Sequence, residues 1–355
     1  MQFSDIIKRS WNDNILFSAL IELTYRCNLD CFFCYNDTSL LGTSLTREQY
    51  FKLFEELREL GAMNLILSGG EPLAHPDFFE LGKKARQLGF VVRIKSNGHA
   101  LRERLAHRIK KEIDPFIIEI SLHGACTETH DRQTRVAGSF EMLIQNLQIL
   151  KELDLRFRLN STLTTWNAEE VEAMYVIAER FGVNLQIDTT VTLRDNGDRT
   201  PLDVAPSAEN LQSLFRIQKR MIEKKSTVST PSKKMQSDSN MMGGLDGTKK
   251  KTASGRHCGA GSSTVAIDPF GNVYPCVQWR RTIGSLHDDC IANIWSNNES
   301  LASIRQENDA ASQALDDLGK NKQAAAFCPG LAYSLTGKAT EIYPVARLRH
   351  QLLVK

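Results

Sequence analysis

The sequence predicts an α/β fold in which a parallel sheet alternates with helices, and three observations support this. Six apolar strand-like runs alternate with helical segments between residues 18 and 190, as a parallel sheet with crossover helices requires. Six units are too few for the eight of a closed (β/α)8 barrel. A chain of 355 residues with 41% hydrophobic residues is also long enough for a large core and a second, smaller domain.

The expected elements follow one another in regular order after a lead-in, residues 1–17, that contains a short helix. The strands are short apolar runs, at 18–24, 64–68, 90–96, 115–122, 155–163 and 183–190. The helices have apolar residues three and four positions apart or a charged pattern, at 46–60, 76–88, 101–111, 139–153, 167–181 and 206–221. Thr46 is placed to cap the first of these helices, and Gly61 to end it.

Composition narrows the class of protein. No run approaches eighteen apolar residues and the first residues lack a signal-peptide pattern, so we expect a cytoplasmic protein that does not enter a membrane. The 44 basic and 42 acidic residues leave a net charge of +2, which argues neither for nor against nucleic acid. We expect no nucleic-acid partner. The eight cysteines are clustered, which favours metal ligation over disulfides in a reducing compartment.

Three cysteines with the spacing C-x3-C-x2-C follow the first expected strand. Cys27, Cys31 and Cys34 lie on one loop, where three thiolates can hold a cluster of four irons and leave one iron open. The alternative is a structural zinc knuckle, which needs a fourth ligand nearby. No Cys or His that could serve occurs before His75.

A second motif, Gly69-Gly70-Glu71-Pro72, follows the second expected strand. Glycines at a strand end let the backbone approach a ligand, and a carboxylate beside them can accept hydrogen bonds from an ammonium group. On its own this motif is an ordinary turn. Together with the cysteine triplet it resembles the signature of the radical S-adenosylmethionine (radical SAM) superfamily.

This resemblance implies a partial, TIM-like (β/α)6 barrel over residues 18–190 and a [4Fe-4S] cluster whose open iron binds S-adenosylmethionine (SAM). It also implies that the aromatic residue before the last cysteine, Phe33, contacts the adenine, and that the Gly69–Pro72 motif holds the amino group of SAM. By the same resemblance, polar residues near the strand ends are candidates for its ribose and carboxylate: Ser96, Asn97, Ser121, Asn160 and Arg135. Ser and Asn are also common at such positions as caps and turn formers.

A basic segment separates this unit from a second group of cysteines. Residues 224–256 contain eight Lys or Arg against two Asp, a net charge of +6. Such a segment cannot bury enough apolar surface to order itself, so we expect a solvated linker, with a basic lid or docking strand for an acidic peptide as the alternative. The expected domains are therefore 18–223, the linker 224–256, and 257–355.

The last expected domain contains Cys258, Cys276, Cys290 and Cys328. A hairpin with Gly271 in its turn would bring Cys258 and Cys276 together. This region resembles the small auxiliary iron-sulfur domain of the SPASM and twitch subfamilies. It departs from the full SPASM pattern, because Ala332 stands where a cysteine is expected and no cysteine follows Cys328.

Four cysteines support at most one auxiliary [4Fe-4S] cluster. We expect Cys258, Cys276 and Cys328 to be ligands, with Cys290, another residue or the substrate as the fourth. A zinc ribbon is the alternative for this set.

The resemblance implies a reaction and its partners. Such enzymes cleave SAM reductively to a 5′-deoxyadenosyl radical that abstracts hydrogen from a substrate. We expect the substrate to be a ribosomally made precursor peptide that receives a crosslink, an epimerisation or an excision. Oxidation of a small molecule in cofactor or natural-product biosynthesis is the alternative. Further expected partners are a reductant such as flavodoxin or ferredoxin and a separate protein that recognises the leader peptide. The sequence assigns no catalytic acid or base.

Overall fold

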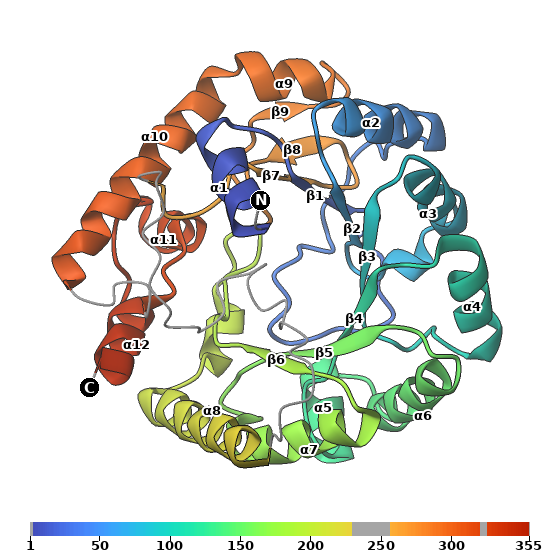
Figure 1. Ribbon diagram of the computed structural model, residues 1–355, viewed down its shortest axis with the longest axis vertical. Coiled ribbons are helices and arrows are strands. Elements are labelled where there is room, and N and C mark those ends of the chain that lie inside the picture. The colour runs from blue at the N-terminus through green and yellow to red at the C-terminus, as the bar shows by residue number, and fades with distance from the viewer. Residues whose placement is uncertain (1–2, 229–255, 320–324, 355) are drawn as a thin grey trace.

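The computed structural model describes residues 3–228, 256–319 and 325–354, and it contains one curved sheet surrounded by helices (Figure 1). The strand order in the described residues is β6-β5-β4-β3-β2-β1-β7-β8-β9. The strands are β1 (Ser18–Glu22), β2 (Asn64–Ser68), β3 (Val91–Ser96), β4 (Ile117–Ser121), β5 (Phe157–Thr162), β6 (Leu185–Asp188), β7 (Thr264–Ile267), β8 (Asn272–Tyr274) and β9 (Gly284–Ser285). The first six strands are all parallel, which confirms the predicted partial (β/α)6 barrel.

Most of the helices surround the sheet on its outer side, whereas α1 (Phe3–Asn12) lies inside this ring in the view of Figure 1. The other helices are α2 (Arg47–Glu59), α3 (Phe78–Gln87), α4 (Glu103–Arg108), α5 (Thr127–Thr134), α6 (Ser139–Glu152), α7 (Val171–Phe181), α8 (Ala208–Val228), α9 (Ile291–Asn297), α10 (Glu299–Ala314), α11 (Pro329–Thr336) and α12 (Pro344–Val354). Short helical turns occur at Pro72–Ala74, Ile109–Ile113, Ala168–Glu170, Thr200–Val204 and Leu315–Leu318. None of the helices in the described part of the chain is long and apolar enough to cross a membrane.

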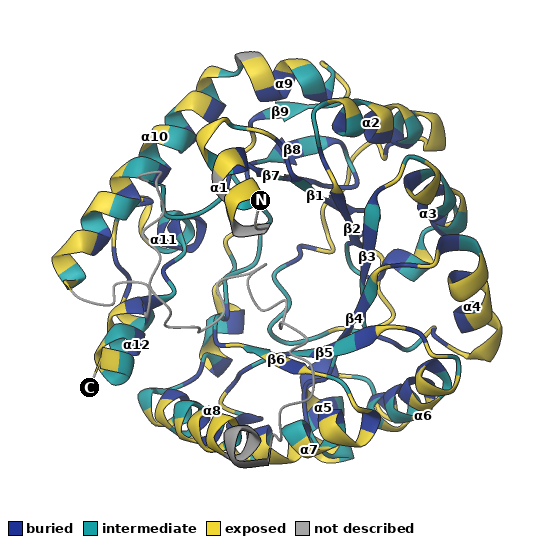
Figure 2. Ribbon diagram, viewed as in Figure 1, coloured by how far each residue is buried: buried dark blue, intermediate teal, exposed yellow. Residues whose placement is uncertain are grey.

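Helix α2 shows why most boundaries were predictable. Thr46 and Gln49 form the expected N-terminal cap, since the Thr46 side chain accepts from the Gln49 amide and the Gln49 side chain accepts from the Thr46 amide. Four residues of the predicted apolar stripe, Tyr50, Leu53, Phe54 and Leu57, are buried. The fifth, Leu60 at the helix end, is half-buried. Figure 2 shows the same division on the other outer helices, whose exposed residues face away from the sheet.

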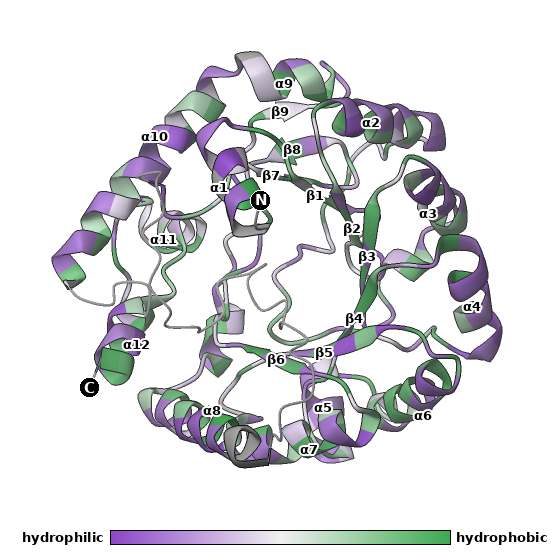
Figure 3. Ribbon diagram, in the orientation of Figure 1, coloured by the Kyte–Doolittle hydropathy of each residue, from purple (hydrophilic) through white to green (hydrophobic). Residues whose placement is uncertain are grey.

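Helix α5 was not predicted. Its sequence, Thr127–Thr134, is polar throughout, and its buried residues are His130, Gln133 and Thr134. It therefore has no apolar stripe from which a helical period could be read. Figure 3 shows how this polar helix differs from the mixed helices beside it.

The C-terminal hairpin continues the barrel sheet. Strand β7 pairs in parallel with β1, Ser18 opposite Thr264, while β8 and β9 add antiparallel strands. The sheet therefore extends directly from the six-strand unit into the region of the second cysteine group. Helix α8 runs to Val228, and residues 229–255 of the expected linker lie outside the described residues.

The two faces of the sheet differ in polarity. Residues such as Ile21, Leu67 and Ile94 belong to the large core beneath the helices. On the inner face, Leu20, Ile66 and Ala266 form a separate small apolar cluster. The inner face of β3 to β5 also carries charged and polar side chains, which are described below.

Candidate functional site

The first cysteine group lies on the loop that leaves β1. Cys27 is exposed, whereas Cys31 and Cys34 are half-buried. Burial raises the pKa of the Cys31 thiol, and negative charge on Cys34 and Cys27 raises it further. Burial likewise raises the pKa of Cys34 to about 11. The three thiols therefore lie close enough to influence one another, and they hold their protons until a cation binds.

The donor set of this loop suits the expected cluster. Cys27, Cys31 and Cys34 are three neighbouring thiols from one loop. In a cluster of four irons, each of three cysteines binds a different iron and one iron stays open.

The Gly69-Gly70-Glu71 loop packs directly against the cysteine loop. The Gly70 amide donates to the Thr24 carbonyl at 2.7 Å, and the Glu71 amide donates to the Arg26 carbonyl at 2.9 Å. A Cβ atom on Gly69 would lie 2.3 Å from the Thr24 oxygen, and Gly69 has φ +132°. The glycines are thus required by the close approach of two segments of this chain, a reason that the sequence did not reveal.

Glu71 connects this loop to the end of β3. Its buried carboxylate accepts hydrogen bonds from Leu73 N at 3.2 Å, Ser96 Oγ at 3.0 Å and Asn97 N at 2.8 Å. Burial raises the pKa of Glu71 to about 7, and the hydrogen bonds oppose this rise. Asn97 Nδ2 in turn lies 3.7 Å from Cys27 Sγ. A continuous series of contacts therefore leads from Glu71 to a cysteine.

Other predicted SAM residues lie on the α5 side of the cysteine loop. The rings of Phe33 and His123 are in edge contact, with centroids 4.6 Å apart. Arg135 pairs with Asp30 at 3.2 Å, and its guanidinium lies over the Phe32 ring. The Phe32 amide donates to Gln133 O, so the end of α5 helps to position the cysteine loop.

The remaining predicted residues occupy two places. Ser121 and Asn160 are register partners near the ends of β4 and β5, and Asn160 Nδ2 donates to Glu119 Oε2 at 3.1 Å. Pro72 is buried at the start of a short helical turn beside Glu71. The Gly-Gly-Glu motif is therefore joined to Ser96, Asn97 and Cys27, while Ser121 and Asn160 form a separate pair.

The structure also brings Cys258, Cys276 and Cys328 together. Burial raises the pKa of Cys328 to about 12, and charge on Cys276 and Cys258 contributes to this rise. Cys258 Sγ accepts a hydrogen bond from the buried Asn308 at 3.3 Å. Cys290 instead stands at the start of α9, where the next amide donates to Glu56 of α2.

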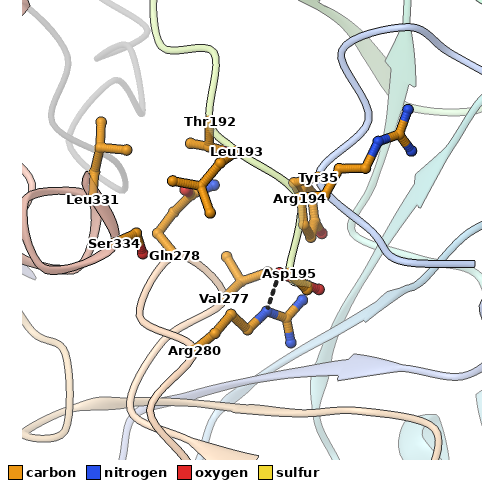
Figure 4. Close-up of a pocket in the computed structure, with 10 residues that line it drawn as sticks. All are labelled: Tyr35, Thr192, Leu193, Arg194, Asp195, Val277, Gln278, Arg280, Leu331 and Ser334. Carbon is orange, nitrogen blue, oxygen red and sulfur yellow. Dashed lines mark ion pairs between the residues drawn. The ribbon is translucent and has the colours of Figure 1, made fainter. Parts of the chain in front are cut away.

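A cavity of about 50 Å³ is lined by residues that neighbour both cysteine groups (Figure 4). Tyr35 follows Cys34, and Val277 follows Cys276. The cavity is lined by Tyr35, Thr192, Leu193, Arg194, Asp195, Val277, Gln278, Arg280, Leu331 and Ser334. It therefore lies between the barrel and the C-terminal cysteines.

Arg280 binds two carboxylates at this cavity. It makes a two-pronged contact with Glu22, at 2.9 and 2.7 Å, and its Nε lies 3.2 Å from Asp195 Oδ1 (Figure 4). Glu22 is fully buried at the end of β1. Burial raises the pKa of Asp195 to about 7, against the opposing charge of Arg280.

The sequence did not predict this network. A glutamate within the apolar run 18–24 nevertheless indicated a buried carboxylate that needs a partner. Arg280 comes from a distant part of the chain, and nothing local identifies it as the partner of Glu22.

Comparison with known proteins identifies two regions. The sequence pattern of the radical SAM superfamily matches residues 21–176, and that of the SPASM iron-sulfur cluster-binding domain matches residues 258–318. These two matches contain both cysteine groups except Cys328.

Relatives of known name span most of the chain. This chain is 26% identical to the AdoMet-dependent heme synthase of Methanosarcina barkeri over 331 residues. The match covers 91% of this chain and 94% of that protein. The chain is 28% identical to the mycofactocin maturase MftC of Mycobacterium tuberculosis, covering 81% and 72%. The fold resembles that of Streptococcus suis SuiB bound to S-adenosylmethionine, with a TM-score of 0.66 and 14% identity, over 85% of this chain and 71% of SuiB.

Proposed function

Because this chain belongs to the radical SAM superfamily and carries a SPASM iron-sulfur cluster-binding domain, we propose that it is a maturase that modifies a ribosomally made precursor peptide. The observation that carries this proposal is that one chain holds two cysteine groups, Cys27, Cys31 and Cys34 beside the Gly-Gly-Glu loop and Cys258, Cys276 and Cys328 in the C-terminal region. A relative named as a maturase, the mycofactocin maturase MftC, covers 81% of this chain. SuiB, which shares the fold, has been solved with its precursor peptide SuiA.

The residues of this chain suit the cofactors of the family. Cys27, Cys31 and Cys34 would hold the SAM-binding [4Fe-4S] cluster, and Cys258, Cys276 and Cys328 would hold one auxiliary cluster. When bound, SAM and its cluster supply a 5′-deoxyadenosyl radical that takes a hydrogen atom from the substrate.

The protein's own contribution is positioning and exclusion of water. Glu71 holds the Ser96–Asn97 turn beside Cys27, so the groups proposed to bind SAM are fixed before it arrives. Arg280 holds Glu22 and Asp195 at the cavity, which fixes the boundary between the barrel and the C-terminal cysteines.

Two further partners belong to this proposal. Reductive cleavage of SAM requires an electron, which we propose is supplied by a flavodoxin or a ferredoxin. A separate protein would recognise the leader segment of the precursor peptide.

The test is an anaerobic assay of the protein reconstituted with iron and sulfide. With SAM and a strong reductant it should form 5′-deoxyadenosine, and the variant with Cys27, Cys31 and Cys34 changed to Ala should not. Short peptides encoded beside its gene should then change mass only in the presence of SAM and active protein. SAM cleavage without any change in these peptides would count against the peptide substrate.

A second candidate function is oxidation of a small molecule. The match to the heme synthase covers nearly the whole of both proteins, which favours a tetrapyrrole. The same assay with a carboxylated porphyrin distinguishes the two, because a SAM-dependent change in its mass and absorption spectrum would support this candidate.

A further inference from the structure

The inner face of the barrel carries a group of charged residues that the proposed function has not yet used. In the parallel register Lys95 of β3 stands opposite Glu119 of β4, and Glu119 stands opposite Arg158 of β5. Arg93 lies two residues before Lys95, on the same face. The alternate residues Val92 and Ile94 point to the helix-covered core instead. The side chains of Arg93, Lys95 and Arg158 thus form one surface, here called the cationic wall.

Glu119 balances only part of this positive charge. Its carboxylate contacts Arg93, Lys95 at 3.3 Å and Arg158 at 3.0 Å, and it also accepts from Asn160. Four donors occupy the acceptor sites of one carboxylate. Burial acts to raise the pKa of Glu119, but the charges of Lys95, Arg93 and Arg158 hold it at about 2. Lys95 and Arg158 therefore share the one carboxylate of Glu119 with Arg93.

The wall retains donors that Glu119 cannot satisfy. Arg158 Nε is buried and has no hydrogen-bond partner in the described residues, and a buried unpaired donor is costly. The side chains of Lys95 and Arg158 are 31% and 20% exposed, whereas that of Glu119 is 1% exposed. An incoming group can thus reach the cations but not the carboxylate.

An apolar surface adjoins this wall. Ile66 of β2 is the register partner of Arg93, and it packs with Leu20 and Ala266. Tyr274 and Val277 pack against the same cluster, and Val277 also lines the cavity between the cysteine groups. The inner face is therefore cationic on one side and apolar on the other.

We propose that the cationic wall binds a carboxylate group of the substrate through Lys95 and Arg158. This rests on the proposed function to the extent that the substrate enters the barrel. A carboxylate supplies two acceptor oxygens and a negative charge, which are what Lys95 and Arg158 lack. Both a peptide and a small organic acid carry this group.

The experiment compares the reconstituted protein's affinity for matched pairs of probes that differ only in the carboxylate. The first pair is octanoate and octanamide, which combine one polar end with an apolar chain. The second is haem and its dimethyl ester, and the third is a short apolar peptide with a free or an amidated C-terminus. Isothermal titration calorimetry at low salt should show preference for the carboxylate member of at least one pair. The pair that shows this preference identifies which class of molecule supplies the carboxylate.

The variants test whether the wall causes this preference. Lys95→Met and Arg158→Gln should each reduce it about tenfold or more, the effect expected for one charge-assisted hydrogen bond. Arg156→Gln is the matched control, since Arg156 loses the same charge but lies 58% exposed and pairs with Asp114. Arg158→Lys, which keeps the charge, should retain much of the preference. If Arg158→Gln fails to fold, Lys95→Met alone tests the inference, because Glu119 keeps its contacts with Arg93 and Arg158 in that variant.

Three results would overturn the inference. These are the absence of carboxylate preference in every pair, a preference that both wall variants retain, and a wall variant that loses only SAM affinity. The last would assign the wall to the cofactor. Failure of the proposed function would give a different result. A carboxylate preference that depends on the wall and is limited to the haem pair would exclude a peptide substrate, while the wall would still bind a carboxylate. Conversely, SAM-dependent peptide modification without wall-dependent binding would reject this inference alone.

Discussion

Glu71→Ala should weaken SAM binding by about tenfold or more while leaving iron content and folding nearly unchanged. Glu71 holds the Ser96–Asn97 turn through its carboxylate, and Asn97 contacts Cys27. Removing the carboxylate releases this turn beside the first cluster. A hydrogen bond to a charged group contributes about 1.5–3 kcal/mol, which corresponds to about ten- to hundredfold in affinity.

The effect on stability should be small because two contributions oppose one another. Loss of the acceptor leaves the Leu73 and Asn97 amides unpaired, at about 1–3 kcal/mol each. Burial has raised the pKa of Glu71 from 4.5 to about 7, so removal of the ionised group recovers about 3 kcal/mol. The free energy of unfolding at about pH 8, where Glu71 is ionised, should therefore change by no more than about 3 kcal/mol.

The assay is titration of SAM into the anaerobic, reconstituted protein, with urea unfolding and iron analysis of the same samples. Glu55→Ala is the matched control, because Glu55 loses the same charge while pairing with Lys84 at a surface site. Unchanged SAM affinity in Glu71→Ala would refute the reasoning and reduce the motif to a structural turn. A large loss of stability that parallels the loss of affinity would refute it equally.

Four further predictions concern the clusters and the buried charges. The anaerobic protein should contain about eight irons, four for each of two clusters, and changing Cys27, Cys31 and Cys34 to Ala should remove about half; about four irons in the wild type would contradict the auxiliary cluster. Cys328→Ala should also lower the iron content yet keep SAM cleavage, provided circular dichroism shows a folded protein. Arg280→Met should cost about 3–5 kcal/mol in urea unfolding, because it leaves Glu22 buried without its cation, whereas the half-exposed Arg281 should tolerate the same change at about 1 kcal/mol or less. As the pH rises from about 4.5 to 7, the SAM-free wild type should lose about 3 kcal/mol of stability relative to Glu71→Gln. The reason is that a raised carboxyl pKa means that the folded state binds the proton more tightly than the unfolded state. A rise in relative stability over that range would contradict the expected direction of this change.

Local patterns in the sequence were sufficient for the barrel strands and most of their helices. Strands β1 and β2 are apolar on consecutive residues because both of their faces are buried. Helix α2 carries its own cap and its own apolar stripe. The cysteine triplet and the Gly-Gly-Glu motif were equally visible, because spacing along one loop largely determines which side chains can converge.

Two features of the fold depended on contacts between distant segments of the chain. The pairing of β7 with β1 joins residues about 250 positions apart, and no local pattern specifies that partner. Helix α5 is polar and is buried through His130, Gln133 and Thr134, so hydrophobic periodicity could not reveal it.

The charged groups show the same division between sequence and tertiary structure most clearly. The sequence by itself determined that Glu22 and Glu119 sit within apolar strands, where an unpaired carboxylate would be costly. Only the tertiary structure decided their partners: Arg280, which follows Cys276 in the sequence, for Glu22, and three cations from the neighbouring strands for Glu119. The physical reason is that burial can be read from neighbours along the chain, whereas charge pairing is set by which strands lie side by side.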